Sequence, residues 1–141
     1  MSISSEGKRL KIAAKRKFGG KCSVYKAFKM MPYSEYLKTE RWAFVKRISL
    51  KMCDNKCIAC GSGKELNCHH IIYRPRGMET KHDVCILCRD CHSIFHEKIS
   101  KSYLKSFKDM LKPKSGRSEM YLEVIRMLSD MINLAKTGEL V

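Results

Sequence analysis

Four of the eight cysteines occur as two Cys-x-x-Cys pairs: Cys57 with Cys60, and Cys88 with Cys91. Two such pairs can place four thiolates around one tetrahedral ion, with no position left for water, which is typical of a structural zinc site. A redox-active pair is the alternative, but it fits poorly because two pairs are present and no βαβ pattern surrounds them. The spacing therefore predicts a Zn²⁺ ion that stabilises a small fold.

Cys53 could compete with Cys57 for this ion. The remaining cysteines are expected to be small buried hydrophobic residues: Cys22, Cys68 and Cys85.

Histidines cluster between and just after these pairs. His69 and His70 are adjacent in a hydrophobic, strand-like run, so their side chains should point to opposite faces and have different partners. His92 and His96 are spaced i, i+4 and should share one face of a helix. Together with Asp83, these residues could provide an open metal site and a separate imidazole base, which is what phosphodiester hydrolysis requires.

The elements that would position these side chains follow from the pattern of apolar residues. We expect a strand over 65–72, a loop around Pro75 and Gly77, a second strand over 83–88 and a helix from residue 89 to 99. Residues 101–111 extend or follow that helix. Earlier, 33–52 has helical spacing, with Ser34 as a candidate N-cap and Trp42 as a core residue. Residues 118–136 form a strongly amphipathic helix. The predicted class is α+β, with flanking α-helices around a core that the four-cysteine zinc holds together.

The stretch CIAC…LNCHHIIYRPRGMETKHDVCILCRDCHSIFH resembles the HNH endonucleases, which have the ββα-metal (His-Me finger) core, in the subset with a four-cysteine zinc. Upstream, YSEYLKTERWAFVKRISL resembles the YL-x-S-x-x-W helix that precedes the motif in many small HNH proteins. Together these segments cover about residues 33–97. The resemblance implies a nuclease that cleaves DNA with a divalent ion such as Mg²⁺.

The resemblance also implies roles for single residues. His69 would bind the catalytic ion and His70 would be the general base that takes a proton from water. His92 would be a ligand from the helix. Asp83 stands where the family usually has Asn, and it could either bind the ion or orient His70. His96 resembles the additional helical ligand of colicin-type members, but it could instead contact phosphate or lie at the surface.

The charge distribution favours a polyanionic partner. The chain has a formal net charge of +15, and residues 1–53 hold 14 basic and 3 acidic residues. A solubilising surface usually mixes both signs, so we expect nucleic acid, and the resemblance implies that it is DNA, double-stranded in form. Arg74 and Arg89 are candidate phosphate ligands, whereas Arg76 is expected to be a solvated loop charge. The basic N-terminal arm supplies three more candidates: Lys15, Arg16 and Lys17.

These observations divide the chain into a basic arm (1–31), a nuclease domain with its preceding helix (32–99) and a helical extension (100–141). The methionines of the extension suit core packing or a partner helix, so self-association or a protein partner is a further expectation. No apolar run is long enough to cross a membrane and no signal peptide is visible, so we expect the cytoplasm of a bacterial or phage-infected cell. The alternative function is a non-catalytic, zinc-stabilised module that binds nucleic acid.

Overall fold

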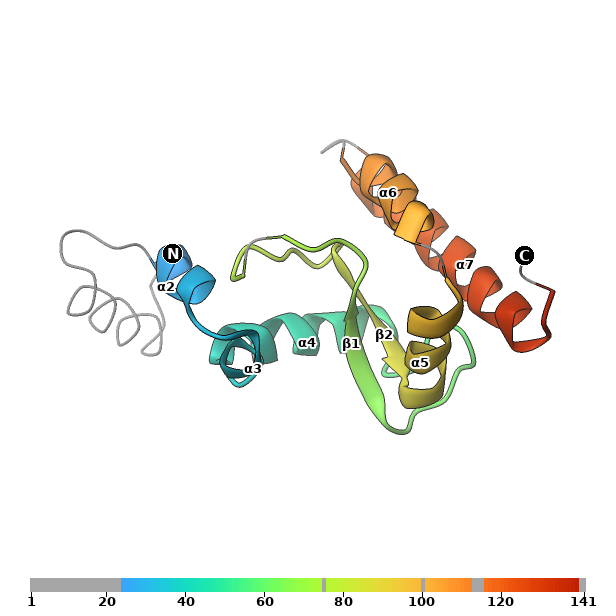
Figure 1. Cartoon of the computed structure of the whole chain (residues 1–141), viewed down its shortest axis with the longest axis horizontal. Coiled ribbons are helices and arrows are strands. Elements are labelled where there is room, and N and C mark those ends of the chain that lie inside the picture. The colour runs from blue at the N-terminus through green and yellow to red at the C-terminus, as the bar shows by residue number, and fades with distance from the viewer. Residues whose placement is uncertain (1–23, 75, 100, 113–115, 140–141) are drawn as a thin grey trace. The chain divides into compact units, whose positions relative to one another are not determined.

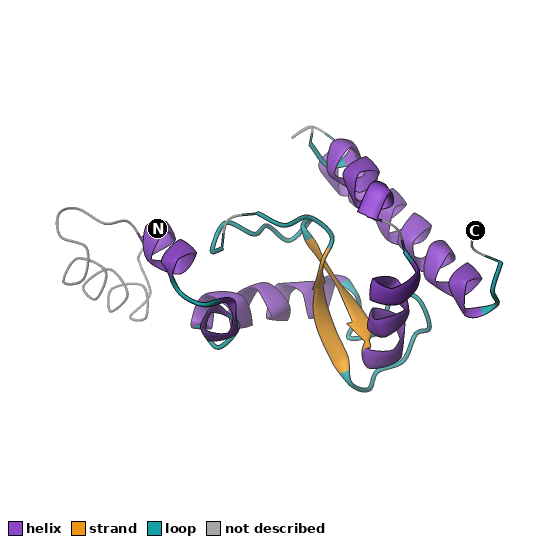
Figure 2. Ribbon diagram, in the orientation of Figure 1, coloured by secondary structure: helices purple, strands orange, loops and turns teal. Residues whose placement is uncertain are grey.

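The computed structural model describes residues 24–74, 76–99, 101–112 and 116–139. The structure combines α-helices with a two-stranded antiparallel sheet, which confirms the α+β class (Figures 1 and 2). The elements in chain order are α2 (Val24–Met30), α3 (Tyr33–Tyr36), α4 (Glu40–Met52), β1 (Leu66–His70), β2 (Val84–Cys88), α5 (Arg89–Lys98), α6 (Lys101–Met110) and α7 (Arg117–Lys136).

The described residues form two compact units. One comprises the residues up to Lys46 together with Arg74–Glu79, and the other comprises Arg47–Tyr73 together with the residues from Thr80 onward. The domain boundaries inferred from the sequence stay a prediction. No helix among the described residues is long and apolar enough to cross a membrane.

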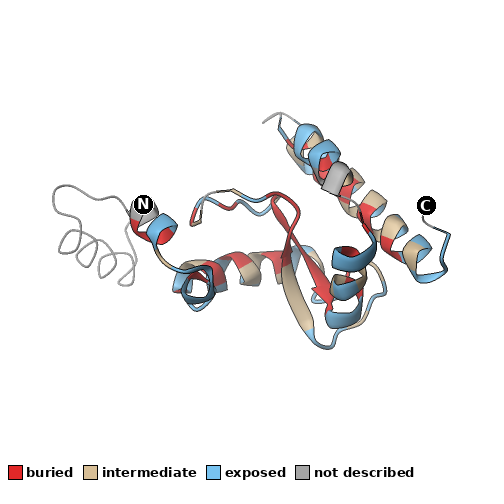
Figure 3. Cartoon of the chain, in the orientation of Figure 1, coloured by how far each residue is buried: buried red, intermediate tan, exposed pale blue. Residues whose placement is uncertain are grey.

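The larger unit is built on the hairpin of β1 and β2, followed directly by α5. Leu66 lies opposite Cys88 and His70 opposite Val84 in the antiparallel register. All five residues of β2 are buried, whereas the first three of β1 are only partly buried (Figure 3). A strand that is buried throughout is expected to be a continuous apolar run, and VCILC is such a run.

Helix α5 packs on both strands and on α7, and α6 packs on α7. The buried residues of α7 are spaced by three or four along the helix and join the core of the larger unit: Tyr121, Val124, Leu128 and Ile132. Each such side chain stabilises the fold by roughly 1.5–3 kcal/mol when it is fully removed from water. The predicted amphipathic helix is therefore confirmed, and its apolar stripe packs within the chain itself. Self-association through this helix stays a prediction.

The helix expected over 33–52 is interrupted, so that expectation was wrong. Helix α3 ends at Tyr36 and α4 begins at Glu40. The hydroxyl of Thr39 accepts a hydrogen bond from the backbone N–H of Trp42 at 3.3 Å, which is the bond that an N-cap residue makes. Thr39 thus starts α4, and Ser34 lies inside α3 instead of capping the helix. Trp42 is buried, as the sequence indicated.

In the smaller unit, a buried tyrosine holds the loop of Arg74–Glu79. Tyr36 donates a hydrogen bond to the Glu79 carboxylate at 2.6 Å and accepts one from the Gly77 N–H at 3.0 Å. Gly77 has a φ of +86°, and a Cβ at this position would lie 2.4 Å from the ring of Phe28. Only glycine fits this position without strain, because it has no side chain to meet that ring.

Candidate functional site

The structure brings Cys57, Cys60, Cys88 and Cys91 together. Their sulfur atoms all lie within 4.8 Å of one another. The sulfurs of Cys60 and Cys88 are 3.6 Å apart. Two thiolates bound to one tetrahedral zinc at about 2.3 Å would be about 3.8 Å apart, so the four side chains fit such an ion with little movement. The cluster could therefore hold a structural metal such as zinc.

Local backbone structure explains how each pair reaches the cluster. The turn after α4 passes through two left-handed residues, Asp54 (φ 53°) and Asn55 (φ 55°), residue types that tolerate this conformation. Ile58 then donates its N–H to the carbonyl of Ile86 at 3.0 Å, which attaches the first pair to β2. The second pair lies at the start of α5, where the sulfur of the N-cap residue Cys88 accepts the N–H of Cys91.

Hydrogen bonds favour a thiolate at Cys57. Burial raises the pKa of this thiol, but backbone N–H groups of Cys88, Cys60 and Ala59 donate to its sulfur and outweigh that effect. The net result lowers its pKa to about 7. Backbone N–H groups that point at a sulfur stabilise negative charge there, which suits a metal-binding thiolate.

A second group consists of His69 from β1 with His92 and His96 from α5. Their ligand nitrogens lie within 4.8 Å of one another. The Nε2 atoms of His92 and His96 are 2.9 Å apart, as the i, i+4 spacing on one helical face allows. Two nitrogens that share one ion at about 2.1 Å lie roughly 3.0–3.4 Å apart, so this pair is close to the required separation. His96, whose role was open from the sequence, belongs to this group.

His69 is the buried member of the group. Its ring packs against that of Phe95, with centroids 4.2 Å apart, and only 2% of the residue is exposed. Burial, followed by the charges of His92, His96 and His70, lowers its pKa to about 3. The ring is therefore neutral at pH 7 and keeps a lone pair for a metal ion. Within the described part of the chain, no group forms a hydrogen bond with its buried Nε2. A buried nitrogen of this kind fits a metal ligand.

His70 lies outside this group. It is opposite Val84 in the sheet register, one position beyond His69, so its side chain leaves the other face of β1. Its ring stacks on that of Tyr73 with centroids 5.1 Å apart, and 6% of the residue is exposed. The two adjacent histidines thus have different surroundings, in agreement with the sequence argument.

Asp83 precedes β2 and is almost fully buried. Its carboxylate accepts hydrogen bonds from the Thr80 N–H at 2.7 Å and from the Thr80 hydroxyl at 2.9 Å. These bonds close the turn that leads into β2. Asp83 does not belong to the group formed by the three histidines. Both roles considered for it, metal ligand and partner of His70, stay predictions.

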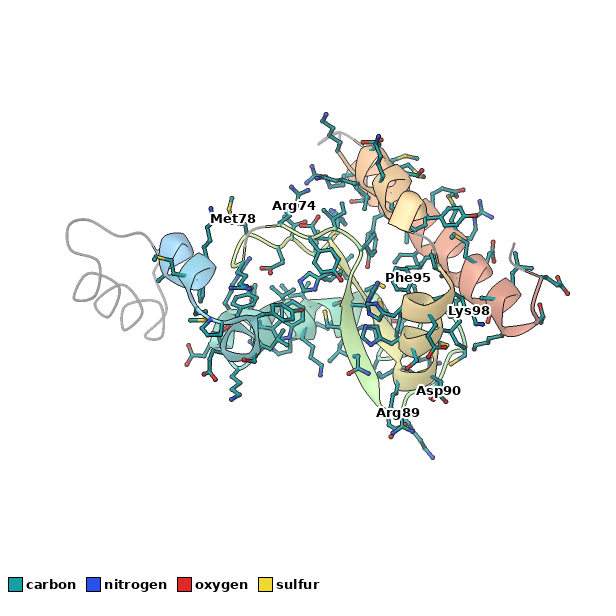
Figure 4. The ribbon with its side chains drawn as sticks, in the orientation of Figure 1. Arg74, Met78, Arg89, Asp90, Phe95 and Lys98 are labelled. Carbon is teal, nitrogen blue, oxygen red and sulfur yellow. The ribbon has the colours of Figure 1, made fainter. Side chains whose placement is uncertain are left out.

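The candidate phosphate ligands are spread over several segments. Arg89 lies at the start of α5, beside Asp90 (Figure 4), and forms an ion pair with Glu65 at 3.3 Å. Both side chains of this pair are exposed, so it contributes little to stability. Arg74 is half-buried in the loop after β1. The three arm residues lie outside the described part of the chain: Lys15, Arg16 and Lys17.

Sequence reasoning missed two residues near the cysteine cluster, Asn133 and Lys136. Asn133 donates a hydrogen bond to the carbonyl of Ala59 at 3.0 Å, across 74 positions of the sequence. Lys136 follows it by three residues on the same helix face, and the sulfur of Cys91 raises the pKa of its ammonium group. Nothing in the pattern of α7 distinguishes these polar residues from others on a solvated helix face, so no local signal could have identified them.

Comparison with protein-family models, with curated proteins and with solved structures gives no match for this chain. The resemblance to HNH endonucleases therefore rests on the motif residues of the sequence.

Proposed function

We propose that this chain is a metal-dependent endonuclease of the HNH type that hydrolyses phosphodiester bonds of DNA. The observation that carries this proposal is the group of His69, His92 and His96. Three imidazoles from a strand and the adjacent helix converge, and three protein ligands leave coordination positions open for water or a phosphate oxygen. The cysteine cluster is different, because four thiolates occupy all four coordination positions of a tetrahedral ion and leave none for water.

In this proposal the two groups have separate tasks. A zinc ion held by the four cysteines fixes the start of α5 against the hairpin. The three histidines would hold a divalent ion, which would supply Lewis-acid stabilisation of negative charge on the phosphate. Imidazole nitrogens suit an ion such as Ni²⁺ or Zn²⁺ better than Mg²⁺, which prefers oxygen ligands. Neutral imidazoles suit this task, and the lowered pKa of His69 keeps that ring neutral well below pH 7.

His70 is the proposed general base. A neutral imidazole nitrogen can accept a proton from water. The stack on Tyr73 fixes its ring plane, and the strand geometry keeps it from binding the same ion as His69. Arg74 and Arg89 are proposed to contact phosphate oxygens, and the net charge of +15 would attract DNA.

The burial of His70 favours a second candidate function. A base must reach water, whereas only 6% of His70 is exposed and its ring is covered by Tyr73. Under this second candidate, the chain is a non-catalytic module that binds nucleic acid and uses both metal groups for stability. The two candidates differ in what the loss of the His70 imidazole does.

The test is cleavage of supercoiled plasmid in the presence of Mg²⁺, Mn²⁺ or Ni²⁺. We expect His70→Ala to bind DNA as the wild type does but to cleave it at least ~100-fold more slowly, the usual scale for loss of a general base. His82→Ala is the matched control, because it removes an imidazole from the same unit that belongs to neither metal group. Excess metal should partly restore His69→Ala but not His70→Ala. Cleavage by His70→Ala at the wild-type rate, or no cleavage by the wild type with any of these ions, would favour the non-catalytic module.

A further inference from the structure

The last turns of α7 lie beside the first cysteine pair, although more than 70 residues separate them in the sequence. The side-chain amide of Asn133 donates a hydrogen bond to the carbonyl of Ala59 at 3.0 Å. Ala59 stands between Cys57 and Cys60, in the turn that presents both sulfurs. This contact fixes a peptide unit of the turn by means of a helix that lies outside the HNH-like segment.

Lys136 follows Asn133 by three residues and therefore lies on the same face of α7. Because Asn133 contacts the turn that carries Cys57 and Cys60, this face of α7 is turned toward the cysteine cluster. The contact of Asn133 and the position of Lys136 thus point to the same cluster.

We propose that the C-terminal end of α7 completes the four-cysteine metal centre. In this arrangement Lys136 compensates negative charge at the thiolates, and Asn133 holds the turn that carries Cys57 and Cys60. This proposal rests on the proposed structural zinc and is independent of the nuclease activity. It makes the C-terminal helix part of the metal site as well as part of the hydrophobic core.

The charge of the metal centre explains why a cation such as Lys136 matters there. Four thiolates and one Zn²⁺ carry a net charge of about −2, which is costly beside a buried core unless cations or N–H donors lie close to it. A charged donor on a sulfur stabilises the thiolate and makes the sulfur a poorer base, so protons compete less well with the metal. Loss of partners of this kind typically lowers metal affinity 10–100-fold. Because Lys136 is exposed, water screens the interaction, and we expect the lower end of that range.

A lysine in the last turn of a helix also interacts favourably with the helix dipole, without any metal. The two roles are separable because both Asn133 and Lys136 are exposed. Their replacement creates no cavity in the core. If Lys136 acted only on the helix dipole, its loss would lower the stability of the fold slightly but would not specifically weaken zinc binding. Zinc retention is therefore the measurement that distinguishes them.

The experiment follows transfer of zinc from the full-length protein to a coloured chelator at pH 7. Lys136→Met keeps the length of the side chain and removes its charge, and we expect the zinc dissociation constant to rise about 10-fold. Lys136→Arg should stay near the wild-type value, because it keeps a charged donor. Lys108→Met is the matched control: it removes one positive charge from an exposed position on α6 and should have no effect.

Salt gives an independent readout. At 1 M NaCl the Debye length is about 3 Å, so the difference between wild type and Lys136→Met should shrink. Asn133→Ala should also weaken retention, but with an effect that does not depend on salt. Equal retention by wild type and Lys136→Met at low salt would overturn the proposal, as would equal losses in Lys136→Met and Lys108→Met. A folded wild-type protein without zinc would instead refute the four-cysteine centre itself, and this proposal with it.

Discussion

Replacement of Cys88 by serine offers the sharpest test of what the four-cysteine cluster does. Cys88 ends β2, is the N-cap residue of α5 and contributes one of the four sulfurs. Serine is a preferred N-cap residue, so the variant keeps an acceptor for the Cys91 N–H. The substitution therefore removes a metal ligand while it leaves the start of the helix intact.

The expected loss is large compared with the stability of a small domain. Structural zinc contributes an apparent free energy of about 10–16 kcal/mol in small zinc-binding domains. A typical domain is stable by only about 5–15 kcal/mol in total. Loss of even half of the zinc contribution would therefore remove as much free energy as the whole free energy of unfolding of many domains. The paired strands are only five residues long each, so without zinc the packing around Cys91 and Phe95 is what remains to hold α5 against them.

The assay combines metal analysis with circular dichroism. We expect the wild type to carry one zinc per chain and to unfold cooperatively, and we expect Cys88→Ser to carry little zinc and to lose its cooperative transition. Cys85→Ser is the control, because it makes the same change from sulfur to oxygen in the same strand at a fully buried position outside the cluster. It should lose about 1–3 kcal/mol through burial of a hydroxyl group and still retain zinc.

Two results would refute this reasoning. One is a wild-type protein that folds cooperatively without metal. The other is a Cys88→Ser variant that unfolds at the same temperature as Cys85→Ser, since the loss would then come from the hydroxyl group and not from the ion.

Two further predictions concern protons and the basic arm. The pKa of His69 is about 3 in the folded chain and about 6.5 in an unfolded one, so the unfolded state binds more protons between these values and stability falls as the pH drops below about 6.5. From pH 7 to pH 5.5, urea unfolding should show that the wild type loses about 1 kcal/mol more than His69→Gln does; equal losses would contradict this. Deletion of residues 1–31 removes nine basic residues and one acidic residue, so DNA binding should weaken and depend less steeply on salt. An unchanged salt slope would show that the arm does not contact DNA.

The parts of the fold that the sequence predicted well are those determined by local spacing. A Cys-x-x-Cys pair forms its own turn, and an i, i+4 pair of histidines shares a helix face whatever lies around it. The β1–β2–α5 order followed from the same kind of pattern. The break before α4 was missed because Leu37 continues the apolar spacing, yet it is exposed, and the hydroxyl of Thr39 restarts the helix.

Contacts between distant segments could not be predicted in this way. The bond from Asn133 to Ala59 depends on where α7 packs, and that position is set by side chains buried along the whole helix. Periodicity identifies which face of an element is apolar, but not which neighbour covers it.

The ten residues of α5 carry ligands for both candidate metal groups, and this arrangement makes the two groups unequal. Cys88 and Cys91 lie at its first turn, where the chain leaves β2, whereas His92 and His96 lie farther along the helix. Loss of zinc would release the start of the helix and so disperse the histidines as well. Loss of the histidine-bound ion would leave the cysteines in place, because His96 is exposed and the core packs around Cys91 and Phe95. In the proposed nuclease, the histidine group could therefore exchange its ion or bind substrate at less cost to the fold than the cysteine cluster could.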